Sequence, residues 1–127
     1  MVYSLSSMDG QRVLITGGLG FFGSSLAVSL VKLGAKITSY DPLLPQYGGN
    51  LASIAEISDK IEDVRGDVRD SEMLSKYIRD KDVVFNCAAQ VSHVDSMVDP
   101  FLDVEINCRG NLNVLEAVRK YNDSAKI

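Results

Sequence analysis

Four glycines within eight residues, in the stretch TGGLGFFG at Thr16–Gly23, are the feature of this sequence most suited to chemistry. Counted from Gly18 they read G-x-G-x-x-G, and counted from Gly17 they read G-x-x-G-x-x-G. A glycine-rich loop between a strand and a helix brings backbone N–H groups and the positive end of the helix to a pyrophosphate, because no side chain stands in the way. The stretch predicts a dinucleotide-binding loop if a strand precedes it and a helix follows it.

Asp41 is a second candidate, because it ends the short apolar run Lys36–Tyr40 and precedes Pro42. A carboxylate at the end of the second strand can accept hydrogen bonds from both adenosine-ribose hydroxyls and repels a 2′-phosphate. The residues that follow, Pro42 to Leu44, supply no arginine for such a phosphate, so Asp41 favours NAD over NADP. The alternative role for Asp41 is a solvated carboxylate at the strand end or a turn former before proline.

The elements that must position these residues alternate between strand and helix. Apolar runs predict strands at Arg12–Thr16, at Lys36–Tyr40, within Ile61–Val68 and at Asp82–Ala89. Helical spacing predicts helices from the glycines to a C-terminal Gly34, at Ser71–Arg79 with Ser71 as N-cap, and at Pro100–Tyr121, with a weak helix at Leu51–Lys60.

Such alternation predicts parallel strands joined by right-handed crossovers, which is the doubly wound, Rossmann-type α/β class. We expect one NAD(P)-binding domain over residues 1–127, because the length suits a single core and leaves no room for a substrate domain. Ala125–Ile127 follow a polar turn and resemble the beginning of a fifth strand. The predicted sheet is therefore incomplete, truncated near the start of that strand.

Composition excludes several classes of function. The 13 basic residues are scattered among 17 acidic ones, and the net charge of −4 argues against a nucleic-acid partner. The apolar stretches are far below the roughly 20 residues of a membrane span, and we recognise no signal peptide, so we expect a cytoplasmic protein with no membrane partner. Cys87 and Cys108 lack C-x-x-C spacing and are expected to be buried and reduced. We also expect no metal site.

Five motifs in chain order carry a resemblance to a known family. They are TGGLGFFG at Thr16–Gly23, YDP at Tyr40–Pro42, RGDVRD at Arg65–Asp70, NCAAQVS at Asn86–Ser92, and the segment Asp99–Arg119 with its N-x-x-G and L-E-A-x-R. From Arg12 onward the chain resembles the N-terminal cofactor-binding half of an extended short-chain dehydrogenase/reductase, in the NAD-dependent nucleotide-sugar epimerase/dehydratase group. The resemblance makes Gly17, Gly20 and Gly23 the functional glycines and leaves Gly18 as a spare small residue.

The resemblance also implies which residues bind the cofactor. The backbone N–H groups of Phe21 and Phe22 are expected to meet the pyrophosphate, and Asp41 the adenosine ribose. Asp67 and Val68 are expected to contact the adenine, although Asp67 also suits a turn or helix entry.

Toward the nicotinamide, Ala88, Ala89 and Gln90 are expected to line the path of the cofactor. Gln90 has a surface-loop residue as its alternative. Asn107 matches a family asparagine that organises backbone and water, although helix packing explains it equally well. Asn111 stands where the family often has threonine, which leaves its contact open.

No catalytic residue is assigned within this sequence. The family uses a tyrosine base, a lysine four positions later and an upstream serine or threonine, all expected beyond Ile127. Tyr77 and Lys81 match this spacing by letters only, since they precede the fourth predicted strand. His93, the only histidine, lies in a polar stretch without an evident orienting partner and is expected to face solvent.

We therefore expect the NAD-binding portion of a nucleotide-sugar epimerase or dehydratase, which in the intact enzyme transfers hydride transiently from sugar to NAD. One alternative is an NAD(P)-dependent reductase of the same superfamily, and another is a noncatalytic dinucleotide-binding module. The predicted helix Pro100–Tyr121 resembles the helix that family members pair in a homodimer, although a single apolar stripe also suits packing on its own sheet.

Overall fold

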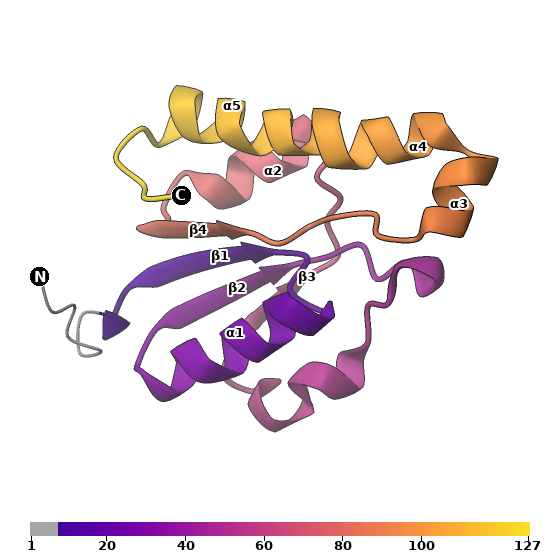
Figure 1. Ribbon diagram of the computed structural model, residues 1–127. Helices are drawn as coiled ribbons and strands as arrows, with labels where there is room; N and C mark the ends of the chain where they lie inside the picture. The colour runs from indigo at the N-terminus through magenta and orange to yellow at the C-terminus, as the bar shows by residue number, and fades with distance from the viewer. Residues whose placement is uncertain (1–7) are drawn as a thin grey trace, which may run out of the picture.

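A parallel sheet with helices on both faces forms the centre of the molecule in the computed structural model, which describes residues 8–127 (Figure 1). Its strands are β1 (Arg12–Thr16), β2 (Lys36–Tyr40), β3 (Glu62–Val64) and β4 (Val83–Asn86). They stand in the order β3-β2-β1-β4, and every neighbouring pair is parallel. This order is that of the first four strands of a Rossmann sheet, so the predicted α/β class is confirmed.

Helix α1 (Phe21–Lys32) and the 3-10 helix η3 (Leu51–Ile57) lie on one face of the sheet, and α2 (Ser71–Ile78) and α5 (Asn111–Tyr121) lie on the other (Figure 1). The remaining elements are the 3-10 turn η2 (Pro45–Tyr47), the short helices α3 (His93–Val98) and α4 (Pro100–Val104), and the π-helical segment η4 (Glu105–Gly110). The predicted helix Pro100–Tyr121 is present, but six of its residues are wound as a π-helix.

The core consists of two apolar clusters, one on each face of the sheet. Because side chains alternate along a strand, Leu14 of β1 joins the cluster under α2 and α5, whereas Val13 and Ile15 join the cluster under α1 and η3. All three are fully buried. A central parallel strand is covered on both faces, which explains why β1 is an apolar run instead of an alternating pattern.

Two local expectations are corrected by the structure. The N-cap of α2 is Asp70, not Ser71, because the Asp70 carboxylate accepts from the Met73 N–H at 3.0 Å and Ser71 is already helical. Cys108 is exposed on η4, so the expectation of two buried cysteines is wrong for it, whereas Cys87 is half-buried. Both are free thiols.

The residues after α5 return to the sheet beside β4. Lys126 donates its N–H to Asp82 O at 3.0 Å and accepts from the Val84 N–H at 2.8 Å, which makes a parallel bridge opposite Val83. Asn122 anchors the preceding turn by donating its amide to Ile78 O at 2.8 Å and to Lys81 O at 2.6 Å. These contacts agree with the expectation that Ala125–Ile127 begin a fifth strand.

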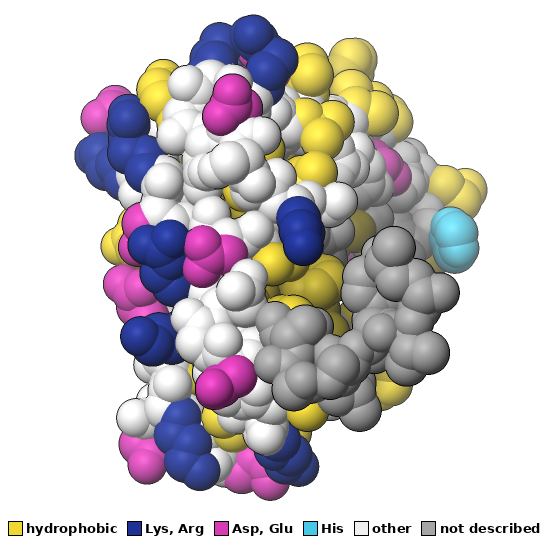
Figure 2. All heavy atoms as spheres, turned by 90° about the vertical axis from the view of Figure 1, so that its left-hand side faces the viewer, with side chains coloured by type: hydrophobic (Ala, Val, Ile, Leu, Met, Phe, Trp, Pro, Cys, Tyr) yellow, Lys and Arg dark blue, Asp and Glu magenta, His cyan; other side chains and the backbone are white. Residues whose placement is uncertain are grey.

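Acidic and basic side chains are interspersed over the face that Figure 2 shows. Within residues 8–127, no helix combines the length and apolar character that a membrane crossing needs. The same residues contain no group of three or more His, Cys, Asp or Glu side chains placed to hold a metal ion.

An ion pair joins the amino ends of the neighbouring strands β1 and β4. Asp82, just before β4, accepts from the Arg12 backbone N–H at 2.8 Å and from the Arg12 guanidinium at 2.9 and 3.1 Å. The hydrogen bonds from the Arg12 side chain, followed by that from its backbone, lower the pKa of Asp82 to about 2. The pair closes β1 against β4 where the sheet begins.

We expect Asp82→Asn to destabilise the protein at about pH 6 and to have less effect as the pH falls from about 4 toward 2. The pKa of Asp82 in the folded protein lies below its ordinary value of 3.8, so the ionised carboxylate contributes stability above that value and loses it during protonation. Urea titrations across this pH range measure the difference in the free energy of unfolding. Because the pair is solvent-exposed, the effect should be modest.

Asp123→Asn is the control, since Asp123 is exposed and makes no ion pair with the other described residues. It should leave the pH dependence of the wild type unchanged. A difference between wild type and Asp82→Asn that stays constant from about pH 6 to pH 2 would contradict this role of Asp82.

Candidate functional site

A pocket lies at the carboxyl ends of β1, β2 and β4, where the strand order reverses direction from β1. Ligands of open α/β sheets bind at such a switch point. The pocket is lined by Gly17, Gly20, Tyr40, Asp41, Pro42, Leu44, Tyr47, Gly49, Gly66, Asp67, Val68, Cys87, Ala88, Ala89 and Ile106.

Close backbone contacts explain why two of these positions, Gly17 and Gly23, are occupied by glycine. Gly17 has φ +66°, and a Cβ there would lie 2.7 Å from Cys87 O. A Cβ on Gly23 would lie 2.1 Å from Gly17 O, so helix α1 can approach the loop only without a side chain at this position. The loop, the end of β4 and the start of α1 therefore meet at Gly17.

The other two glycines, Gly18 and Gly20, differ in how strongly the fold excludes a side chain. A Cβ on Gly18 would lie 2.4 Å from the buried Ser39 Oγ and 3.1 Å from Ser39 Cα, so β2 packs directly against Gly18, which is not among the residues that line the pocket. Gly20 has ordinary extended backbone angles, and its nearest Cβ contact would be 3.3 Å, to Gly17 O. The fold alone gives the weakest reason for a glycine at Gly20, which lines the pocket.

Helix α1 begins at the pocket with Phe21 and Phe22. Their side chains are 81% and 77% exposed, and no side chain caps the helix. The first N–H groups of a helix have no acceptor within it, and the helix dipole makes this end positive. The amino end of α1 can therefore receive an anion.

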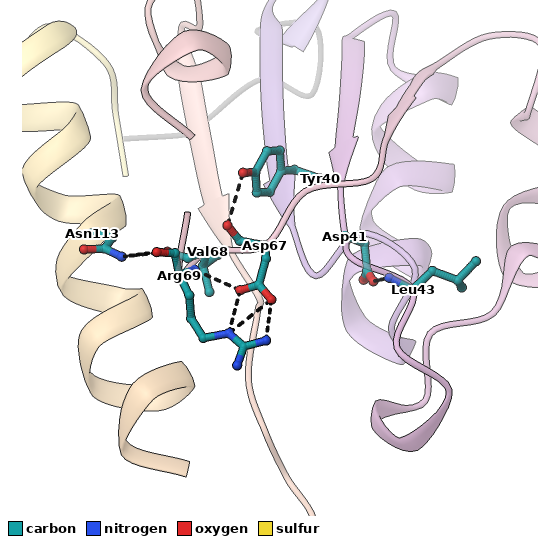
Figure 3. A network of polar contacts seen from close by, with 7 residues as sticks. All are labelled: Tyr40, Asp41, Leu43, Asp67, Val68, Arg69 and Asn113. Atoms are coloured by element: carbon teal, nitrogen blue, oxygen red, sulfur yellow. Dashed lines mark hydrogen bonds and ion pairs between the residues drawn. The ribbon is translucent and has the colours of Figure 1, made fainter. Parts of the chain in front are cut away.

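Asp41 is a buried carboxylate in the pocket lining, only 7% exposed. Its Oδ2 accepts from the Leu19 N–H at 3.1 Å. Its Oδ1 accepts from the Leu43 N–H at 2.8 Å, as Figure 3 shows. The second bond forms a turn across Pro42, and it holds Leu43 at φ +53°. Asp41 is thus a turn former before proline, which was one of its alternative roles, and it is at the same time a buried residue of the pocket lining, not a solvated carboxylate.

The turn after β3 brings Asp67 and Val68 to the pocket. The Asp67 carboxylate accepts from the Arg69 backbone N–H at 2.8 Å and from the Arg69 guanidinium at distances down to 2.6 Å (Figure 3). Burial by itself would raise the pKa of Asp67, but the hydrogen bonds from Arg69 outweigh it and lower that pKa. Asp67 is therefore an ionised acceptor at neutral pH.

At the far side of the pocket, Ala88 and Ala89 belong to the lining, whereas Gln90 does not. Gln90 is 4% exposed, and its amide donates to Ser92 O at 3.0 Å and to Ser96 Oγ at 3.1 Å. Asn107 accepts from the Gln90 N–H at 2.9 Å and donates to Gln90 O at 2.8 Å. Gln90 is thus not a surface-loop residue, and Asn107 holds its backbone against η4.

Thr16 and Asn86 connect the strands beneath the pocket. Thr16 Oγ1 donates to Asn86 Oδ1 at 2.6 Å and accepts from the Ala88 N–H at 3.3 Å. Asn86 in turn donates its amide to Asn111 Oδ1 on α5. Asn111, whose contact the sequence left open, therefore joins α5 to the end of β4.

Sequence reasoning missed several lining residues, among them Leu44, Tyr47, Gly49 and Ile106. The two prolines and two glycines of Pro42–Asn50 predict a loop, and that prediction includes no role for the loop at the site. A loop that leaves the carboxyl end of β2 necessarily stays near a ligand at that edge, and this signal could have identified it.

Tyr77 and Lys81 do not contribute to the pocket. The Tyr77 ring packs against Tyr40, and Lys81 lies at the amino end of β4, opposite the pocket. His93 is exposed at the start of α3, as expected.

Comparison with known proteins places this arrangement in a family. The model of the family described as GDP-mannose 4,6 dehydratase matches residues 14–127. CDP-paratose 2-epimerase of Salmonella typhi is 37% identical over 122 residues, covering 92% of this chain and 35% of that protein.

Solved structures agree with the sequence relatives. The structure of epimerase Mth375 from Methanothermobacter thermautotrophicus is 34% identical, with a TM-score of 0.83 over 93% of this chain and 34% of that one. The Thermus thermophilus UDP-glucose 4-epimerase complex with NAD is 37% identical, with a TM-score of 0.75 over 87% of this chain and 34% of that one.

The chain spans about a third of the length of these relatives. Its match to the family extends over most of its own length, and the resemblance drawn from the five motifs is confirmed. The chain belongs to the GDP-mannose 4,6 dehydratase family, within the nucleotide-sugar epimerases and dehydratases of the extended short-chain dehydrogenase/reductase type.

Proposed function

We propose that this chain is the NAD-binding portion of a nucleotide-sugar epimerase or dehydratase. The observation that carries the proposal is Gly20, which lines the pocket at the start of α1 although its own backbone would accept a side chain. A Cβ would meet only Gly17 O, at 3.3 Å, so close approach of a ligand is a further reason for a glycine there. NAD in the Thermus thermophilus relative supports the choice of ligand.

The residues around the pocket fit the parts of NAD in order. The N–H groups of Phe21 and Phe22, between Gly20 and Gly23, face the pyrophosphate, and the dipole of α1 favours its charge. Asp41 accepts from the adenosine ribose with the lone pairs that Leu19 and Leu43 leave free.

Asp67 and Val68 meet the adenine, and Ala88 and Ala89 leave room for the nicotinamide ribose. Gln90 acts on that end of the site through the loop whose shape it fixes. Bound NAD would supply a hydride acceptor for a sugar carbon in the intact enzyme. Recognition of the nucleotide sugar belongs, in this proposal, to the part of the relatives that this chain does not cover.

We also propose that the intact protein pairs through α4 and α5. The inner side of the continuous helix is buried at Ile106, Val114, Ala117 and Val118. Large apolar side chains remain exposed on it at Phe101, Val104, Leu112 and Leu115. Packing on its own sheet therefore accounts for only one of two apolar faces, and a second copy would cover the other.

We expect Gly20→Ala to fold with a melting temperature close to that of the wild type but to bind NAD at least about tenfold more weakly. Its Cβ meets only Gly17 O, at 3.3 Å, whereas it would occupy the place of the pyrophosphate. Isothermal titration calorimetry with NAD on the intact protein measures the affinity.

Gly23→Ala is the contrasting variant, because its Cβ would lie 2.1 Å from Gly17 O. It should destabilise the fold by about 1–3 kcal/mol in chemical denaturation. If Gly20→Ala binds NAD like the wild type, or if the wild type itself shows no binding, the proposed function is wrong.

Asp41→Asn should reduce the preference for NAD over NADP at least about tenfold. The amide oxygen can still accept one backbone N–H, but the charge that repels a 2′-phosphate is gone. Calorimetry with both dinucleotides gives the ratio, and Asp59→Asn, in an exposed turn outside the pocket, provides the control. If Asp41→Asn leaves the ratio of NAD affinity to NADP affinity unchanged, Asp41 does not determine the preference for NAD.

Leu115→Glu should convert the intact protein from a dimer to a monomer at micromolar concentration, since it puts a charge into the proposed apolar contact. Light scattering reads the molar mass directly. A wild type that is monomeric at these concentrations contradicts the pairing.

A further inference from the structure

We infer that Tyr40 and Asn113 are positioning residues for recognition of the adenine base, each orienting one peptide group of the Asp67–Arg69 turn. The inference rests on the proposed binding of NAD and extends it to two residues that are not among those expected to touch the cofactor. The carrying observation is that two side chains from different layers hold two consecutive carbonyls (Figure 3).

Tyr40 acts on the first of these peptide groups from β2. Its hydroxyl donates to Asp67 O at 3.2 Å, and the same oxygen accepts from the Asp70 N–H at 3.0 Å. In a planar trans peptide the C=O and the following N–H point in opposite directions. Fixing Asp67 O therefore directs the Val68 N–H away from the Tyr40 hydroxyl. This N–H finds no acceptor within residues 8–127 and remains available to a ligand.

Asn113 acts on the next peptide group from α5. Its amide donates to Val68 O at 2.9 Å and, more weakly, to Arg69 O at 3.4 Å. By the same planarity, fixing Val68 O directs the Arg69 N–H the other way, and this N–H meets Asp67 Oδ1 at 2.8 Å. Asn113 thereby sets the direction of the Asp67 carboxylate without touching it.

Close packing leaves the turn little freedom between these two side chains. A Cβ on Gly66 would lie 2.2 Å from the Tyr40 ring, and a Cβ on Gly110 would lie 2.6 Å from Val68 Cγ2. Tyr40 is fully buried, and burial, followed by the nearby Asp70 and Asp67, raises the pKa of its phenol, so the hydroxyl remains a donor.

The two oriented groups, the Val68 N–H and the Asp67 carboxylate, are complementary to the hydrogen-bonding edge of adenine. The Val68 N–H is a donor for adenine N1, and the Asp67 carboxylate is an acceptor for the adenine 6-amino group. Hypoxanthine reverses both groups, since it carries a 6-oxo acceptor and an N1–H donor. A rigid turn should therefore discriminate between these two bases, because the wrong base leaves polar groups unpaired.

The test compares NAD with nicotinamide hypoxanthine dinucleotide on the intact protein by calorimetry. The wild type should prefer NAD by at least about tenfold, and Tyr40→Phe and Asn113→Ala should each reduce this ratio to about threefold or less. Asn113→Gln, which keeps the amide, should recover part of the preference. Thermal melting of each variant identifies a temperature at which all are folded.

Matched controls separate positioning from general loss of stability. Asn122→Ala removes an asparagine that also holds two carbonyls, but at the far end of α5. Tyr77→Phe removes a hydroxyl from the ring that packs on Tyr40. Both should keep the wild-type ratio even where they lower the melting temperature.

The outcomes distinguish this inference from the proposed function. A wild type that binds neither dinucleotide contradicts the proposed function. A wild type that binds NAD, with a ratio that Tyr40→Phe and Asn113→Ala leave unchanged, contradicts the inference alone. An Asn122→Ala variant that lowers the ratio as much as Asn113→Ala also overturns it, because the effect would then be loss of stability.

Discussion

The close backbone approach at Gly17 is the constraint on which the rest of the structure depends. Its N–H donates to Tyr40 O at the end of β2, its Cα faces Cys87 at the end of β4, and its carbonyl lies against Gly23 in α1. Two strands and one helix can meet at this point only if no side chain intervenes. The pocket exists because these elements converge there, with the amino end of α1 and the carboxylate of Asp41 on its walls.

The second organising feature is the helix that runs from α4 through η4 to α5. It holds two segments that lead to the pocket, since Asn107 pairs with the backbone of Gln90 and Asn113 with that of Val68. The π-helical segment η4 lies between them and places Ile106 in the pocket lining. Such segments are rare within helices and are frequent at functional sites. In this chain, one helix links the turn at Val68 to the loop at Gln90.

The sequence predicted most of the framework because local patterns determine it. The apolar run that ends at the glycines predicted β1, because a buried parallel strand has this pattern. The position of Asp41 at the end of β2 predicted that its carboxylate lies at the binding site. The cap of α2 was misplaced by one residue because Asp70 and Ser71 are both capping types. The packing of Gly18 on Ser39 could not be predicted, because these two residues are close only in space.

Contacts between distant segments account for the other differences. Gln90 lies in a motif segment, but its amide pairs with Ser92 and Ser96, which no spacing rule predicts. Tyr47 reaches the pocket through the path of the loop after Asp41. The roles of Tyr40 and Asn113 depend on which carbonyls face them, and only the folded arrangement determines this.

A crystal structure of the intact protein with NAD tests the central claim most directly. The account predicts the pyrophosphate at the N–H groups of Phe21 and Phe22, the adenosine-ribose hydroxyls within hydrogen-bond distance of Asp41, and the adenine edge against the Val68 N–H and the Asp67 carboxylate. NAD bound elsewhere, or an adenine base turned away from Asp67 and Val68 into solvent, would contradict it.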